Sequence, residues 1–296
     1  MISICIPVYN YNVVSLVHEL SNQLEVLSVG GEILVFDDCS EEAYRLQNSS
    51  LKDIASVEYK ELGQNVGRIG IRSLLAGAAR YPWLLYIDSD SGVVNKSFLL
   101  NYYKTIDERS NVITGGRLYT PKHPALCTKR LHWKYGTERE AKRGSRIALH
   151  TNNFLVKKEV FQELHFPTYL KGYGHEDTWM QMEFEKKGIG ITHIHNPVIH
   201  VGLEEAKTFL EKSDHASKNL LLLASYENKA LLRKYSPLYN AFHLLSRSRS
   251  TKVFFFLFRL VKNRVLHNLN SCTPSLFYLD IWKLYRMVSL SNQYPV

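Results

Sequence analysis

The chain has 296 residues, of which 45% are hydrophobic and 22% charged, an ordinary globular composition that excludes a disordered, collagen-like or coiled-coil protein. The net charge of +9 lies in the last third, since residues 1–206 hold 23 basic and 24 acidic residues and residues 207–296 hold 14 and 4. This distribution argues against a nucleic-acid partner and predicts an anionic partner for the C-terminal region.

The cysteines and the apolar runs bear on where the protein resides. The four cysteines show neither zinc-ligand spacing nor a disulfide framework, which favours a reducing compartment and a cytoplasmic location. The N-terminus lacks the basic and long apolar segments of a signal peptide. The longest apolar run, Val253 to Phe258, is far shorter than the roughly 20 residues that a membrane span needs.

Strand and helix patterns alternate through the first 90 residues. Short apolar runs predict strands, and apolar residues at helical spacing predict the helices between them. The expected strands are 2–8, 32–36, 56–59 and 83–87, and the expected helices are 13–27, a polar helix after Asp38, and 67–80. This order predicts an α/β fold with a mostly parallel, doubly wound sheet. No GxGxxG follows the first strand, so we expect no dinucleotide site.

The pattern loosens after residue 110. Residues 129–150 are basic and polar, and we expect them to form a mobile loop over the site. The other expected elements are strands at 111–114, 151–156, 188–195 and 196–201, helices at 157–164, 176–187 and 204–234, and a basic, aromatic-rich tail at 236–296.

Polar residues follow three of the expected strands, at Pro7–Asn10, Asp37–Asp38 and Asp88–Asp90. Ligands of doubly wound sheets bind beyond the carboxyl ends of the strands, so we expect these residues on one rim. Asp88 and Asp90 lie one residue apart and can both face Mg²⁺ or Mn²⁺, which prefer carboxylate and phosphate oxygens. The alternative for this DxD is a solvated turn.

Asp38 and two arginines are further candidates for the rim. Asp38 can accept hydrogen bonds from a ribose or a base, and its alternative role, shared with Ser40, is to cap the following helix. Arg68 and Arg72 lie one helical turn apart, and guanidinium groups pair with phosphate. For Arg72 we favour simple exposure to solvent.

Glu176 and Asp177 begin a helix after a Gly-Tyr-Gly turn. A helix N-terminus favours carboxylates, so capping is one interpretation. The other is a general base presented on an adaptable loop.

Taken in order, the motifs resemble the family 2 glycosyltransferases with a GT-A fold, over residues 2–204. The GYGHED segment looks like the GxGxED segment of galactosyltransferase-type enzymes. The motifs that carry the resemblance are IPVYN (6–10), VFDDCS (35–40), NVGRIGIRSLL (65–75), LLYIDSDS (84–91), TNNFLVKKEVF (151–161), GYGHEDTW (172–179) and NPVIHVGLE (196–204).

The resemblance implies a donor site made from the first three motifs and the DxD. Asp38 matches the carboxylate that holds the base, and Arg68 matches a basic residue near the donor. The DxD contributes Asp88 and Ser89 to this side. Against the nucleotide lies the family's first loop, matched here by Pro7, Tyr9 and Asn10.

The resemblance also implies a metal and a general base. Asp90, with Asp88, matches the metal-binding carboxylates for Mn²⁺ or Mg²⁺, and His200 falls where some members supply a further ligand. Asp177 matches the residue that deprotonates the acceptor hydroxyl, and Glu176 beside it positions the acceptor.

The expected fold is therefore a GT-A domain over residues 1–204, with a nucleotide-binding half (1–110) and an acceptor half (111–204), followed by a helical basic region (205–296). The expected activity is inverting transfer of a hexose or N-acetylhexosamine from a nucleotide sugar, UDP-linked, to a hydroxyl of a glycan or lipid-linked acceptor in polysaccharide biosynthesis. The alternatives are a non-catalytic sugar- or membrane-binding protein on the same fold and a nucleotidyltransferase.

The C-terminal region is basic and aromatic. No acidic residue occurs from Asn228 to Leu279, which contains nine Lys and Arg residues. Cations near anionic lipid and aromatic side chains in the interface predict peripheral attachment to the inner membrane face. The alternative is a packed helical subdomain or an oligomer contact. The aromatic residues concerned are Phe254, Phe255, Phe256, Phe258, Trp282 and Tyr285.

Overall fold

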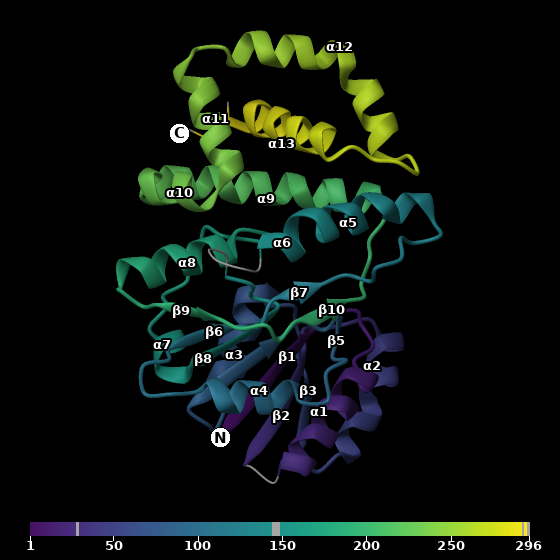
Figure 1. The fold of residues 1–296 in the computed structure, drawn as a ribbon, viewed down its shortest axis with the longest axis vertical. Helices are drawn as coiled ribbons and strands as arrows, with labels where there is room; N and C mark the ends of the chain where they lie inside the picture. The colour runs from purple at the N-terminus through teal and green to yellow at the C-terminus, as the bar shows by residue number, and fades with distance from the viewer. Residues whose placement is uncertain (28–29, 144–148, 292, 295–296) are drawn as a thin grey trace. The chain divides into compact units, whose positions relative to one another are not determined.

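The computed structural model describes residues 1–27, 30–143, 149–291 and 293–294. A seven-stranded, mostly parallel sheet, built from strands between residues 2 and 193, organises this part of the chain (Figure 1). The strand order is β3-β2-β1-β4-β8-β6-β9, and only β8 runs antiparallel to its neighbours. The strands are β1 (Ile2–Val8), β2 (Gly31–Asp37), β3 (Val57–Glu61), β4 (Trp83–Ile87), β6 (Val112–Thr114), β8 (Asn153–Lys157) and β9 (Ile191–His193). The α/β class and the parallel sheet predicted from the sequence are confirmed.

A second, three-stranded sheet lies in the same unit, in the order β5-β10-β7. Its strands are β5 (Ser91–Gly92), β7 (Arg117–Leu118) and β10 (Val198–His200). The helices of this unit are α1 (Val14–Leu27), α2 (Glu42–Asn48), α3 (Gly67–Ala78), α4 (Phe98–Thr105) and α7 (Lys158–Gln162), with a 3₁₀ helix at Ser49–Asp53.

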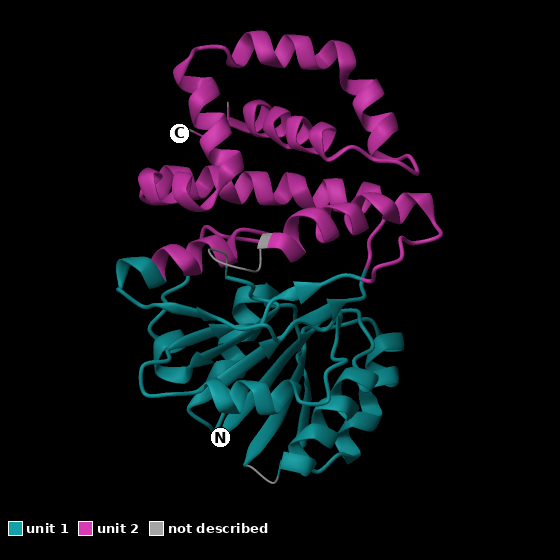
Figure 2. Cartoon of the chain, in the orientation of Figure 1, with its two compact units in different colours: residues 1–119, 144–166, 184–202 teal, residues 120–143, 167–183, 203–296 magenta. Residues whose placement is uncertain are grey.

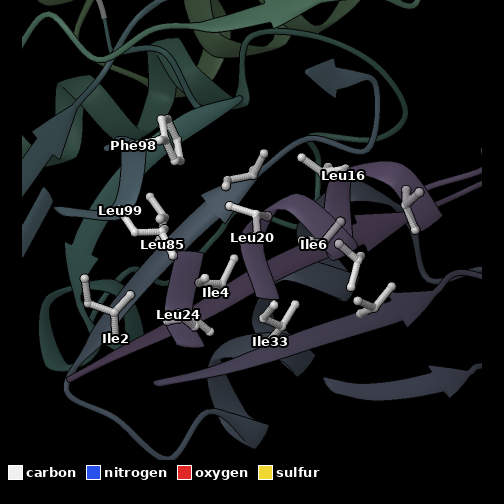
Figure 3. Close-up of a cluster of buried hydrophobic side chains, with 14 of the residues drawn as sticks. Ile2, Ile4, Ile6, Leu16, Leu20, Leu24, Ile33, Leu85, Phe98 and Leu99 are labelled. Atoms are coloured by element: carbon white, nitrogen blue, oxygen red, sulfur yellow. The ribbon is translucent and has the colours of Figure 1, made fainter. Parts of the chain in front are cut away.

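The apolar alternation of β1 and the helical spacing of α1 meet in one core (Figure 3). Ile2, Ile4 and Ile6 occupy every second position of β1 and therefore point to the same face of the sheet. Leu20 and Leu24 lie one helical turn apart on α1 and are buried in the same cluster. This burial, about 1.5–3 kcal/mol for each large apolar side chain, fixes the register of β1 and so the position of the loop that follows it.

The chain divides into two compact units (Figure 2). Unit 1 comprises residues 1–119, 144–166 and 184–202, and unit 2 comprises residues 120–143, 167–183 and 203–296. The division differs from the expected boundary at residue 204. Residues 120–143 belong to unit 2 because their side chains pack in its core. Leu131, for example, is fully buried there together with residues of the C-terminal helices.

Unit 2 is helical. The predicted helix 204–234 is two helices, because Asn228 caps a new helix by accepting hydrogen bonds from the amides of Ala230 and Leu231. The helices are α5 (Arg130–Tyr135), a π-helical turn (Gly136–Glu140), α6 (Ala141–Arg143), α8 (Glu176–Lys186), α9 (Ala206–Tyr226), α10 (Lys229–Tyr235), α11 (Pro237–Arg247), α12 (Thr251–Leu269) and α13 (Leu276–Ser291). Helix α8 crosses the division, since its residues from 184 onward belong to unit 1.

The expected mobile loop at 129–150 is wrong for residues 130–143, which are helical, while 144–148 lie outside the described residues. His132 is 7% exposed, stacks on Phe209 at a ring distance of 4.9 Å, and accepts a hydrogen bond from the amide of Glu204. Polar composition hid this helix, because only two of its side chains, Leu131 and Tyr135, carry the apolar spacing.

Most of the aromatic residues expected at a membrane are packed inside unit 2. Phe258 and Tyr285 lie 4.3 Å apart between ring centroids, and Phe255 stacks on Tyr285 at 5.1 Å. Trp282 is 7% exposed, and Phe254 packs against the same cluster. For these residues the packed-subdomain alternative holds. Among the described residues, no helix is long and apolar enough to cross a membrane.

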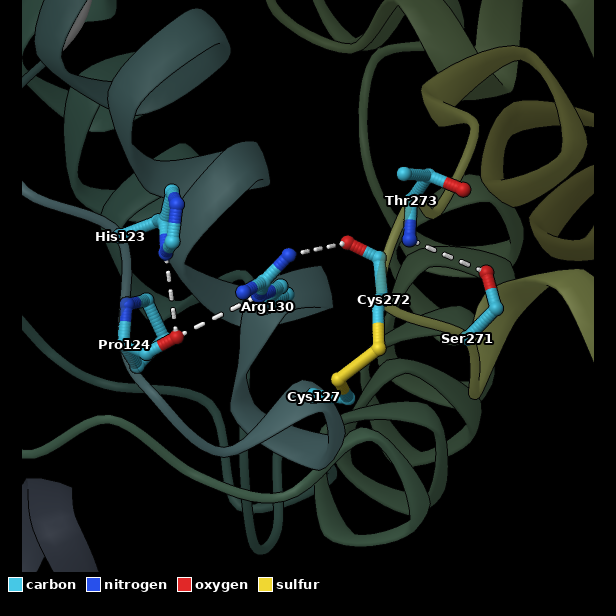
Figure 4. Close-up of a disulfide and its surroundings, with 7 residues drawn as sticks. All are labelled: His123, Pro124, Cys127, Arg130, Ser271, Cys272 and Thr273. Carbon is cyan, nitrogen blue, oxygen red and sulfur yellow. Dashed lines mark hydrogen bonds between the residues drawn. A yellow bond between two sulfur atoms is a disulfide. The ribbon is translucent and has the colours of Figure 1, made fainter.

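A disulfide joins Cys127 and Cys272, 145 residues apart (Figure 4). Arg130 reinforces the junction by donating hydrogen bonds to the carbonyl oxygens of Cys272 and Pro124 at 3.0 and 3.3 Å. The expectation of no disulfide is therefore wrong for this pair, and the reducing compartment inferred from it loses its support. Widely spaced cysteines carry no sequence signal, because only the fold brings them together. A bond closing so long a loop stabilises by about 2–4 kcal/mol.

Candidate functional site

Three polar strand ends meet at one edge of the main sheet. The parallel strands β2, β1 and β4 are neighbours, so their carboxyl ends lie on the same side, as the sequence predicts. The amide of Asp38, just past β2, donates to the carbonyl of Val8 at the end of β1 at 2.7 Å. This edge gathers the first loop, Asp38 and the DxD.

The first loop is held in place by Asn10. Its backbone is left-handed, with φ of 49°, and its amide donates to Ser40 Oγ at 2.8 Å. The amide of Glu41 donates in turn to Asn10 Oδ1 at 2.8 Å. Asn10 thus ties the loop to the turn before α2. Tyr9 is 57% exposed and Pro7 is half-buried, so Tyr9 offers the larger free surface to a nucleotide.

Asp38 caps a helix, but not the one that follows it. Its two carboxylate oxygens accept hydrogen bonds from the amides of Val66 and Gly67, at 2.7 and 2.9 Å, at the start of α3. A carboxylate at a helix N-terminus is stabilised by the helix dipole. Each oxygen has a second acceptor position, so Asp38 can hold α3 and still accept a bond from a base N–H.

Asp88, the first aspartate of the DxD, is bound by arginines. Arg68 donates to Oδ2 at 3.0 Å and Arg72 to Oδ1 at 2.9 Å, with Arg117 at 4.0 Å. The solvent exposure expected for Arg72 is wrong, since this residue is 2% exposed and also donates to the carbonyl of Thr151. The apolar spacing of α3 does not reveal that the carboxylate of Asp88 lies beside its buried face.

Asp90, the second aspartate, faces His200. The pairing of β5 with β10 puts His200 opposite Ser91, and His200 Nδ1 lies 3.4 Å from Asp90 Oδ2. Burial alone would raise the pKa of Asp90, but the hydrogen bond and charge of His200, with the charges of Arg117 and Arg68, lower that pKa to about 2. Asp90 is therefore ionised at neutral pH.

Gly202 packs directly against Asp90. A Cβ at position 202 would lie 2.8 Å from Asp90 Cβ and 3.1 Å from Asp90 Oδ2. Under the metal-binding role that the resemblance implies for Asp90, Gly202→Ala is expected to push Asp90 and its backbone away, to lower the melting temperature, and to raise the metal concentration for half-maximal activity about tenfold. Metal titrations of donor hydrolysis measure this.

Gly92→Ala is the matched control. It adds the same methyl group in β5, where the nearest atoms would lie 3.6 and 3.7 Å away at ordinary contact distance. We expect normal metal dependence for Gly92→Ala. Equal behaviour of the two variants would refute a steric role for Gly202.

Several buried polar atoms around the DxD lack hydrogen-bond partners within the described residues. They are Asp90 Oδ1, Ser91 Oγ, Arg72 Nε, and both Nδ2 and Oδ1 of Asn152. Asn152 belongs to this group because its carbonyl accepts the amide of Asp88 at 3.0 Å. Buried polar groups are normally hydrogen-bonded, and each exception costs about 1–3 kcal/mol. Their concentration at one edge of the sheet is what a site for a polar ligand requires.

Asn152→Leu is expected to raise the free energy of unfolding by about 1 kcal/mol, because it removes a buried amide that has no hydrogen-bond partner within the described residues, and to weaken binding of the nucleotide-sugar donor that the resemblance implies. Thermal melts with and without donor measure both effects.

Asn153→Leu is the neighbouring control. Asn153 accepts a hydrogen bond from Tyr102 Oη at 2.6 Å and donates to the carbonyls of Gly116 and Asn196. We expect this change to destabilise the fold, since it leaves buried groups unpaired. A loss of stability in Asn152→Leu as large as in Asn153→Leu would contradict the ligand-binding role of Asn152.

A divalent cation fits the Asp90 side of the DxD better than the Asp88 side. Among the described residues, no group of three or more His, Cys, Asp or Glu side chains is placed to hold a metal. Asp90 nevertheless supplies Oδ1, which has no hydrogen-bond partner among the described residues, and His200 beside it supplies an imidazole. Mg²⁺-type sites often use one or two protein ligands together with substrate phosphates and water. Asp88 is instead engaged by its arginines.

The GYGHED segment in unit 2 is built as a tight, anchored loop. Gly172, Gly174 and His175 have positive φ, and a Cβ at Gly174 would lie 2.6 Å from Ala216 Cβ in α9. Asn219, 4% exposed in the same helix, donates to three carbonyls of the loop at 2.9–3.3 Å; these belong to Lys171, Tyr173 and Gly174. Such anchoring fixes the backbone just before α8.

Glu176 and Asp177 form the first turn of α8, as predicted. Glu176 is 7% exposed, whereas Asp177 is half-buried and its Oδ1 accepts the amide of Thr178 at 2.7 Å. Both the capping role and the general-base role are compatible with this position, because the second oxygen of Asp177 can accept a proton.

Sequence reasoning missed four residues of these sites. Arg117 and Asn152 meet the DxD only through strand pairing and a backbone hydrogen bond. Of the four, Gly202 alone could have been found from the sequence, because it lies in the same motif as His200. A glycine two residues from a candidate metal-ligating histidine suggests close backbone packing at the site. Asn219 had none, since it lies in a long helix far from the loop in sequence.

Comparison with known proteins identifies the family. The sequence model of glycosyl transferase family 2 matches residues 3–165, more than half of the chain. The chain therefore belongs to glycosyl transferase family 2. A comparison with curated proteins found no match.

Solved structures share the fold at low sequence identity. The mannosyltransferase PcManGT from Pyrobaculum calidifontis, in complex with GDP-Man and Mn²⁺, has 13% identity and a TM-score of 0.53, covering 98% of this chain and 86% of that one. Glucosyl-3-phosphoglycerate synthase from Mycobacterium tuberculosis, in complex with Mn²⁺, UDP and glucosyl-3-phosphoglycerate, has 15% and 0.52, covering 76% and 79%. TarS 1–349 from S. aureus, in complex with UDP-GlcNAc, has 16% and 0.50, covering 99% and 91%. The shared architecture is the GT-A fold.

Proposed function

We propose that this glycosyltransferase moves a hexose or N-acetylhexosamine from a UDP-sugar to a hydroxyl group of a glycan or lipid-linked acceptor, with inversion at the anomeric carbon. The observation that carries the proposal is the set of buried polar atoms around the DxD that have no partner in the described chain. A nucleotide sugar with its cation offers the hydroxyls and phosphate oxygens that such groups need. The family match and the nucleotide-sugar complexes of proteins with this fold support the donor class.

On the donor side, the two aspartates of the DxD have different roles. Asp90 and His200 would hold Mn²⁺ or Mg²⁺, and the bound cation would supply positive charge for the diphosphate of the donor. Asp88 forms ion pairs with the buried Arg72 and with Arg68. It thereby orients Arg68, whose side chain is 36% exposed and can bind a phosphate. Asp38 and Tyr9 line the site that binds the base of the nucleotide.

On the acceptor side, Asp177 removes the proton of the acceptor hydroxyl as its oxygen attacks C1, and Glu176 orients the acceptor. The C1–oxygen bond to the nucleotide breaks as the new bond forms, and the electron pair leaves with the diphosphate. A single displacement of this kind inverts the anomeric centre. Asn219 acts as a positioning residue, because it holds the loop that begins α8.

Thermal melts test the donor site directly. We expect one UDP-sugar from a panel of UDP-, GDP- and dTDP-sugars to raise the melting temperature by about 5 °C at a hundredfold excess over Kd, with Mn²⁺ but not with EDTA. Absence of a shift with every donor in folded protein would overturn the donor site.

A further inference from the structure

Helix α12 exposes a row of large apolar side chains. They recur at intervals of three and four residues, so they form one stripe along the helix. The stripe consists of Val253, Phe256, Leu257, Leu260 and Val261, which are exposed by 61, 63, 55, 71 and 47%.

The opposite face of α12 accounts for its packing within unit 2. Phe258, Val265 and Leu269 lie there, at most 3% exposed, in the cluster formed with α13. The stripe is therefore a second apolar face, which the core of unit 2 does not use. Single exposed apolar residues are common, but five on one helix face mark an interaction surface.

Positive charge accompanies the stripe. Lys252, Arg259 and Arg264 are exposed on the same helix, and no acidic residue occurs in the sequence between Asn228 and Leu279. A second copy docked through this face would bring these cations against one another. An anionic partner relieves that repulsion, and the apolar stripe requires an apolar environment beside it.

We propose that α12 lies in the interface of an anionic lipid bilayer, with the stripe turned toward the acyl chains and Lys252 and Arg259 beside it turned toward the headgroups. Arg264 lies in line with the stripe at its C-terminal end, and its long side chain reaches the headgroups from there. Interfacial helices of this type bury their apolar face about 5–10 Å deep, and their binding combines apolar area with attraction to anionic lipid. The surface differs from the one expected from sequence, because Phe254, Phe255 and Phe258 are committed to unit 2. The proposal does not depend on sugar transfer.

Co-sedimentation of the full chain with lipid vesicles tests it. Wild type is expected to bind vesicles containing phosphatidylglycerol at low salt, and to bind about tenfold more weakly to pure phosphatidylcholine or in 0.5 M NaCl. The double variant Phe256→Gln/Leu260→Gln is expected to lose about tenfold in vesicle affinity. Both side chains are exposed, so unchanged melting temperature verifies that the fold is intact.

Leu46→Gln is the matched control, since Leu46 is 66% exposed on α2 in unit 1 and should not affect binding. The proposal is overturned if folded wild type does not bind anionic vesicles at low salt, or if Phe256→Gln/Leu260→Gln binds as wild type does. Light scattering that shows a dimer dissociated by this double variant, without vesicle binding, also overturns it and assigns the stripe to a second copy.

Discussion

Asp90→Asn is expected to reduce sugar transfer by about 10³-fold and to remove its dependence on Mn²⁺ or Mg²⁺. The substitution keeps the shape of the side chain but removes the charge that His200, Arg68 and Arg117 stabilise. Release of UDP from the donor, measured against metal concentration, gives both effects. Metal-dependent activity above about a tenth of wild type would contradict the role of Asp90.

Asp88→Asn provides the contrast within the same motif. Asp88 neutralises Arg72, and their side chains are 12 and 3% exposed. Removing the charge leaves a buried guanidinium uncompensated, so we expect a loss of about 3 kcal/mol in the free energy of unfolding. Chemical denaturation should therefore separate Asp88→Asn, which loses stability, from Asp90→Asn, which chiefly loses metal-dependent activity.

Asp177→Asn is expected to lower kcat about 10³-fold while the KM for the donor changes less than about twofold. A general base contributes about 10²–10⁴-fold, and the amide cannot take the acceptor proton. The asparagine oxygen can still accept the amide of Thr178, so the start of α8 should be retained. Steady-state hydrolysis of the donor, with water as acceptor, measures kcat and KM together.

Glu185→Gln, on the same helix about two turns further, is the control for Asp177→Asn and should leave kcat unchanged. If Asp177→Asn melts below the assay temperature, the loss of activity follows from unfolding, which would favour the capping role of Asp177. An unchanged kcat would exclude Asp177 as the base.

The parallel sheet and the place of the DxD could be predicted from sequence because local signals agree there. β1 and β4 are short apolar runs that end at polar residues, and α1 repeats apolar residues at helical spacing. The topology of such elements then brings Asp38 and Asp88 to one edge. The candidate aspartates were found by this reasoning.

The remaining features depend on partners far away in sequence. In the sequence Arg72 looks like a solvent-exposed residue, because its partner Asp88 lies 16 residues away and contacts it only in the folded chain. Asp38 caps α3 and not the helix that directly follows it. The disulfide of Cys127 with Cys272 follows from tertiary proximity alone. In α12 both faces are apolar, so periodicity did not tell which phenylalanines pack inward.

We propose inverting transfer from a nucleotide sugar, and the configuration of the released sugar is the direct test of that reaction. Proton NMR of donor hydrolysis tests it without knowledge of the acceptor, using the α-linked UDP-sugar that gives the largest thermal shift, with Mn²⁺ and wild-type protein. We expect release of UDP and first appearance of the free sugar as its β anomer, before mutarotation. First appearance of the α anomer, or no release of UDP by folded protein, would contradict it.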